Sequence, residues 1–160
     1  MYEVLNGKRT LRFDGALLAF SSSYREDSPR WVEFTLYRTV GGAYILSRVG
    51  QTRVYHAQGC DVVSRNKPPK TAIPALKDGS SPCNQCQPPR PGSLSEIEVY
   101  VEMPRYWATV SESPTGVVDA LYKYNESGVR YLTNVAEQLL DEASAVDSNI
   151  AQAYKVEDVF

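Results

Sequence analysis

The only histidine and the three cysteines of this chain fall into two close pairs. "VYHAQGC" contains His56 and Cys60, and "SPCNQC" contains Cys83 and Cys86. Thiolate sulfur and imidazole nitrogen are the usual ligands of structural zinc sites, which hold the ion in a tetrahedron of four such groups. Cys-x2-Cys is a common ligand pair in such sites. The less common spacing His-x3-Cys can also bind one ion, because Gly59 can adopt the unusual backbone angles that such a turn requires. Because the four residues use every cysteine and the only histidine, we expect one structural Zn²⁺ site.

Other interpretations of the same residues are a redox dithiol, a catalytic zinc, or four unrelated buried side chains. A redox Cys-x2-Cys begins a helix that lowers its thiol pKa, but Pro88, Pro89 and Pro91 follow here and exclude a helix. A catalytic zinc keeps one coordination position open and needs a general base. Zinc deaminases carry a Glu two residues after the ligating His, and the residue two after His56 is Gln58. The pattern therefore favours structural zinc, with no catalytic residue and no other cofactor.

The elements that position these residues form a run of strands followed by a run of helices. Alternating polarity and turn pairs such as Asn6-Gly7 predict a β meander over residues 1–57, including a strand over 30–39 with Val32, Phe34 and Leu36 on one face. Residues 58–94 are Pro-rich and exclude helix and central strand, so we expect a loop tied by the zinc. Residues 95–110 read as further strands. We expect one α+β domain over residues 1–160.

Residues 111–160 read as the helical part, with two or three helices on one face of the antiparallel sheet. Ser113-Pro114 is an N-cap followed by proline, ahead of a helix over 115–124. A second helix is expected to begin after Ser127-Gly128, and Asp147 can cap a third over 148–155. The second has apolar residues at intervals of three and four: Val129, Leu132, Ala136, Leu139 and Ala143.

Length and composition place the chain among ordinary globular proteins. Its 160 residues are 42% hydrophobic, enough for a core without cross-links. The start "MYEVLNGKRTLRF" lacks the features of a signal peptide, and no apolar run approaches the roughly 20 residues that cross a bilayer. These features predict a cytoplasmic protein with no membrane contact. Three cysteines are an odd number, which disfavours a purely disulfide framework.

Charge is unevenly distributed along the sequence. Residues 1–90 hold 13 Lys and Arg against 7 Asp and Glu, whereas residues 91–160 hold 4 against 12. The asymmetry indicates either two solvated surfaces that differ or a basic face for a polyanion. If the second holds, the nucleic-acid contacts are the basic residues around the zinc motif: Arg53, Arg65, Lys67, Lys70, Lys77 and Arg90.

Aromatic residues are a further candidate for binding. Tyr37, Tyr44, Tyr55, Tyr100, Tyr106 and Trp107 either line an interface, where aromatics with a polar tip are favoured, or are ordinary strand residues.

One stretch, "LRFDGALLAF…RWVEFTLYRTVGGAYIL" over residues 11–46, resembles small actinobacterial proteins with a C-terminal Glu-x-Leu-Asp-Ile signature. In those, an "RFxGxLLA" strand is likewise followed by a "YRTxxGxY" hairpin. The ending "KVEDVF" departs from the signature, and the zinc motif is additional. The resemblance carries over no activity and no functional residue. It associates the chain with phages and mobile elements, and so with a host-interaction role.

Together these patterns predict a small, non-enzymatic, zinc-stabilised binding module that contacts an unidentified protein partner. The alternative is a nucleic-acid-binding protein that uses the basic zinc loop, and the third interpretation is a metal-dependent hydrolase.

Overall fold

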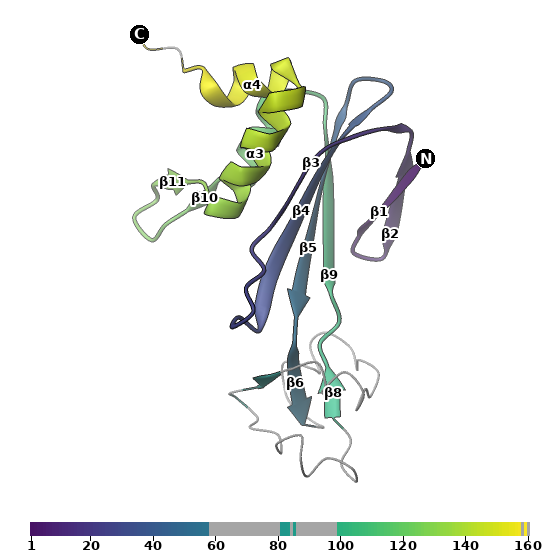
Figure 1. The fold of residues 1–160 in the computed structure, drawn as a ribbon, viewed down its shortest axis with the longest axis vertical. Coiled ribbons are helices and arrows are strands. Elements are labelled where there is room, and N and C mark those ends of the chain that lie inside the picture. Colours follow the sequence, from purple (N-terminus) through teal and green to yellow (C-terminus); the bar gives the residue numbers. More distant parts are fainter. Residues whose placement is uncertain (58–80, 84, 86–98, 158, 160) are drawn as a thin grey trace. The chain divides into compact units, whose positions relative to one another are not determined.

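The computed structural model describes residues 1–57, 81–83, 85, 99–157 and 159 (Figure 1). The chain divides into two compact units. Unit 1 comprises residues 1–23, 32–49 and 105–160, and unit 2 comprises residues 24–31 and 50–104. A single domain over the whole chain stays a prediction. The predicted zinc-tied loop falls almost wholly on residues 58–80 and 86–98, outside the described part.

Unit 1 is built on a four-stranded sheet in the order β3-β4-β5-β9. β3 spans Gly15–Ser22, β4 Arg30–Thr39, β5 Tyr44–Thr52 and β9 Arg105–Ser111. β3 and β4 are antiparallel from Gly15↔Thr39 to Ser22↔Glu33, with a register shift between Leu17 and Ala19. At Gly15 a side chain would collide with the Arg38 carbonyl, so the strand pair can close only around a glycine.

Both faces of this sheet are covered. Alternate residues of β4 and β5, including Phe34, Leu36 and Leu46, are buried under the helices. The residues between them face the other way, where Tyr37 and Ile45 pack against a hairpin of β1 (Tyr2–Asn6) and β2 (Arg9–Phe13). Figure 1 shows α3 and α4 on one side of the strands and this hairpin on the other. The strict alternation predicted for residues 30–39 is thereby confirmed.

Three helices follow β9: α2 (Pro114–Leu121), α3 (Asn134–Val146) and α4 (Ser148–Lys155). The α+β class with C-terminal helices on one face of an antiparallel sheet is confirmed. The caps predicted at Ser113 and Asp147 are also confirmed, because Ser113 accepts from the Gly116 amide at 3.1 Å and Asp147 from the Asn149 amide at 2.9 Å. None of the helices in the described residues is long and apolar enough to cross a membrane.

The predicted start of the second helix is wrong. Ser127-Gly128 instead closes a small hairpin of β10 (Lys123–Tyr124) and β11 (Arg130–Tyr131), with Gly128 at φ 78°. The helix begins later, because the Thr133 hydroxyl accepts from the Ala136 amide and caps it. Val129, assigned to the apolar stripe by its spacing, is 59% exposed on the hairpin.

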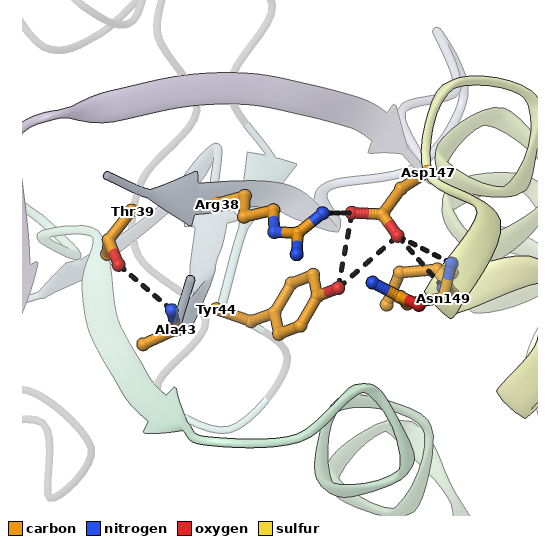
Figure 2. A network of polar contacts seen from close by, with 7 residues as sticks. Arg38, Thr39, Ala43, Tyr44, Asp147 and Asn149 are labelled. Atoms are coloured by element: carbon orange, nitrogen blue, oxygen red, sulfur yellow. Dashed lines mark hydrogen bonds and ion pairs between the residues drawn. The ribbon is translucent and has the colours of Figure 1, made fainter. Parts of the chain in front are cut away.

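Asp147 ties α4 to the sheet as well as capping it (Figure 2). Its carboxylate lies 3.1 Å from Arg38 Nη1 and accepts from the Tyr44 hydroxyl at 3.2 Å. The Asp147 side chain is 1% exposed, so these groups replace the water that it has lost. Burial raises the pKa of the Tyr44 phenol above its ordinary value, and the negative charge of Asp147 raises it further. The Tyr44 hydroxyl therefore stays protonated and can donate.

Unit 2 contains a three-stranded sheet in the order β7-β6-β8. β6 (Val54–Ala57) pairs antiparallel with β8 (Val99–Val101) and parallel with β7 (Ser81–Pro82). The amides of Ser81 and Cys83 donate to Arg53 and Tyr55 at 2.6 and 2.9 Å. Pro82 lies between these donors, and β7 is an edge strand, the position in a sheet that tolerates proline.

We expect Asp147→Ala to destabilise unit 1 by about 2–4 kcal/mol, because one change removes a helix cap and leaves Tyr44 and Arg38 without their buried acceptor. Urea unfolding followed by circular dichroism measures the loss. Ser113→Ala is the matched control, since it removes only the exposed cap of α2 and should destabilise by about 1 kcal/mol. Equal losses in the two variants would contradict the dual role of Asp147.

Candidate metal site

His56 is placed at the centre of the unit 2 sheet. It is the third residue of β6, pairs with Tyr100 of β8, and its side chain is 0% exposed. β6 is hydrogen-bonded to a strand on each side, which fixes the backbone of His56. Because side chains alternate along a strand, the His56 ring lies on the face opposite Tyr55. The ring therefore lies within the fold and not on its surface.

The His56 ring contacts the carboxylate of Glu102, which in turn binds the guanidinium of Arg30. His56 Nε2 lies 2.7 Å from Glu102 Oε1, and both Glu102 oxygens bind Arg30, at 2.8 and 3.0 Å. Glu102 is 5% exposed, whereas Arg30 reaches solvent at 54%. Burial alone would raise the pKa of Glu102, but the hydrogen bonds from Arg30 and His56 outweigh it and bring the pKa below its usual value. Glu102 is therefore a carboxylate that accepts from its neighbours.

This contact fixes which imidazole nitrogen faces the carboxylate. When Nε2 donates its hydrogen to Glu102, the neutral ring presents Nδ1 as a lone-pair donor. Zinc-binding histidines are commonly held in this way, with the nitrogen that does not face the metal donating to a carboxylate. The geometry thus matches that of a histidine oriented for a metal.

Cys83 is brought next to the same strand. Its amide donates to the Tyr55 carbonyl at 2.9 Å, and it directly follows Pro82, the last residue of β7, which pairs with Tyr55. Cys83 is 7% exposed. The structure therefore describes two of the four expected ligands, His56 on β6 and Cys83 directly after the neighbouring strand β7.

The other two expected ligands, Cys60 and Cys86, lie outside the described residues. Within the described ranges no group of three or more His, Cys, Asp or Glu side chains is arranged to hold a metal ion. The four-ligand site therefore stays a prediction, of which the structure describes one half.

Arg53 is the one described residue of the expected nucleic-acid set. Its Nη2 donates to the carbonyls of Glu26 and Ser28 at 2.8 Å each, and its guanidinium lies 5.5 Å from the ring centres of Tyr24 and Trp31. These contacts organise residues 24–31 from within. Arg65, Lys67, Lys70, Lys77 and Arg90 lie outside the described part, so the nucleic-acid surface stays a prediction.

The expected aromatic surface separates into buried and exposed members. Tyr44 and Tyr55 are 2% and 0% exposed, so they belong to the interior and the interface interpretation is wrong for them. Tyr37 is half-buried against the β1–β2 hairpin. Tyr106 and Trp107 of β9 are 38% and 39% exposed and stay available for binding.

Glu102 and Arg30 are the two site residues that the sequence reasoning missed. They lie 46 and 26 positions from His56 along the chain, a separation that no short motif spans. A signal was nevertheless present in "EIEVYVEM", where the glutamates alternate with apolar residues in a stretch of high strand propensity. A strand with acidic residues on one face indicates a buried cationic or imidazole partner when that face is covered.

Comparisons with protein-family models, with curated proteins and with solved structures each found no match. The site is therefore interpreted from its geometry alone.

We expect Glu102→Ala to weaken the β6–β8 pairing by about 2–4 kcal/mol, because it leaves the buried His56 Nε2 and Arg30 without an acceptor. Native-state hydrogen exchange at the β6 amides measures this local loss. Met103→Ala is the matched control, since that neighbouring side chain is 61% exposed and its removal should change exchange by less than about 0.5 kcal/mol. Similar protection in both variants would show that the Glu102 contacts contribute nothing to unit 2.

Proposed function

We propose that this protein is a small, non-enzymatic binding module that is stabilised by a structural Zn²⁺ and contacts a protein partner. The observation that carries the proposal is the buried His56, whose Nε2 contacts Glu102, while the amide of Cys83 donates to Tyr55, the neighbour of His56 on β6. An imidazole held by a carboxylate, next to a thiol, is the arrangement that structural zinc sites use.

The donor set proposed for the ion is His56, Cys60, Cys83 and Cys86. Three thiolates and one imidazole fill a tetrahedron, so no position is left for a water or a substrate. The ion would supply rigidity to a segment whose proline content disfavours helix and central strand. A metal-dependent hydrolase is therefore the third choice.

Exposed apolar side chains support contact with a protein. On the β10–β11 hairpin Tyr124, Val129 and Tyr131 are 70%, 59% and 44% exposed. Asn125 fixes the turn between them, because its side-chain oxygen accepts from the amides of Ser127 and Val129 at 2.9 and 3.0 Å. A firm hairpin that presents two tyrosines is typical of a protein interface, since little side-chain entropy is lost on binding. The host-interaction role implied by the resemblance is the setting that we propose.

Protein purified without added metal should contain about one zinc per chain by elemental analysis. Cys83→Ser should release the ion and lower the melting temperature, because binding of a structural zinc contributes directly to folding. Glu102→Gln keeps the shape but loses the charge behind His56, and should weaken zinc binding about 10- to 100-fold in a competition with a chromogenic chelator.

Met103→Ala is again the control and should bind zinc as the wild type does. Metal-free protein that melts at the same temperature as freshly purified protein would end the zinc proposal. Full zinc loading of the Cys83→Ser variant would remove this residue from the donor set.

For the partner, immobilised protein should capture the same host protein before and after nuclease treatment and at raised salt. Apolar and tyrosine contacts do not weaken steeply with salt, whereas phosphate contacts do. Capture should be lost in a Tyr124→Ser, Tyr131→Ser double variant and kept in Tyr106→Ser, which removes an exposed tyrosine elsewhere in unit 1. Capture that needs nucleic acid, and that fails when Lys67, Lys70 and Lys77 become Glu, would favour the nucleic-acid alternative.

A further inference from the structure

Unit 1 contains a pocket of about 210 Å³ at the C-terminal end of α2. Three neighbouring strands, β4, β5 and β9, contribute Phe34, Arg48 and Trp107. The end of the helix and the residues after it contribute Leu121, Tyr122 and Lys123. Neither the proposed zinc site nor the hairpin tyrosines form part of it.

The alternation of side chains along the strands explains why Arg48 and Trp107 line the same pocket. Arg48 follows Tyr44 and Leu46 at intervals of two, and both of those are buried under the helices. Trp107 precedes Ala108, which packs on the opposite, hairpin-covered face. The pocket is thus the part of the helix-covered face where the helices end. Trp107 remains 39% exposed there, although its strand neighbour Ala108 is 3% exposed.

The charge in this pocket is positive and uncompensated. Arg48 and Lys123 take part in no ion pair among the described residues, and no acidic residue lines the pocket. Two other arginines of the unit contact neighbouring side chains: Arg38 binds Asp147, and Arg130 lies 4.2 Å from the centre of the Tyr122 ring. Two unpaired cations at the rim of an apolar, aromatic-walled pocket match a ligand with one flat apolar part and one anionic group.

We infer that this pocket binds a small aromatic carboxylate. The ring enters between Trp107, Phe34 and Leu121, and the carboxylate lies between Arg48 and Lys123. The volume is below the range usual for drug-sized ligands, so it takes a single ring with a short acid chain. A nucleic-acid strand fits less well, because the helical part of this unit is strongly acidic and would repel further phosphates.

Phenylacetate is the test ligand, and phenylacetamide and inorganic phosphate are the control ligands. In ¹H–¹⁵N spectra of the full chain, phenylacetate should shift the indole signal of Trp107 saturably, with a Kd of about 1 mM as expected for ten non-hydrogen atoms. The chain has two tryptophans, and Trp31→Phe assigns the signals. Phenylacetamide should bind at least about tenfold more weakly, because it lacks the charge, and phosphate should leave the indole unshifted.

Arg48→Met and Lys123→Met should each weaken phenylacetate binding at least about fivefold, whereas Lys155→Met on α4 should leave it unchanged. Equal binding of the acid and the amide would overturn the inference, as would a phosphate-induced shift of the same size or the lack of a saturable Trp107 shift. The comparison of the three ligands uses wild-type protein, so the outcome holds even where a variant fails to fold. The zinc proposal is tested by metal removal in unit 2, whereas the pocket is tested by ligand binding in unit 1. Either proposal can therefore fail while the other holds.

Discussion

The central constraint on unit 1 is that its four-stranded sheet is apolar on both faces, so that each face needs a cover. Phe34, Leu36 and Leu46 require helices on one side, and Tyr37 and Ile45 require the N-terminal hairpin on the other. Because side chains alternate, a slip of one residue in β4 would exchange the two sets and leave each cover facing the wrong surface. The glycine at position 15, which permits the close approach to Arg38, therefore helps to fix the arrangement of every other layer.

Unit 2 is stabilised differently, since the described part of its sheet is small and its centre is polar. His56, Glu102 and Arg30 form a line from a fully buried ring to a half-exposed guanidinium, drawn from three separate stretches of chain. Arg53 adds a second cation that joins residues 24–31 through carbonyl and aromatic contacts. Hydrogen bonds and ion pairs are directional, so they define the geometry of a site more narrowly than apolar packing does. Such contacts are useful in a unit whose prolines limit the hydrogen bonding between strands.

The sequence predicted the parts of this structure that depend on local patterns. The strand over residues 30–39, the turn at Asn6-Gly7 and the caps at Ser113 and Asp147 all follow from side-chain alternation or from short motifs. It failed where a pattern had two solutions: Ser127-Gly128 suits a helix start and a hairpin turn equally, and only the competing cap at Thr133 decides. Of the candidate site, His56 and Cys83 were found by residue type, whereas Glu102 and Arg30 were not, because their role arises from strand pairing across long stretches of chain.

The pairing of β6 with β8 also sets an order of events during synthesis. Tyr55 and Val101 are partners in the ladder although they lie 46 positions apart, so this side of the sheet cannot close until β8 has been made. At about 5–20 residues per second, that delay is roughly 2–9 s. During this interval the imidazole and all three thiols emerge before β8 and Glu102 have been made. If the proposed zinc site forms, ion capture can therefore precede closure of the sheet, and Glu102, which directly follows β8, then reaches a histidine that already holds the ion.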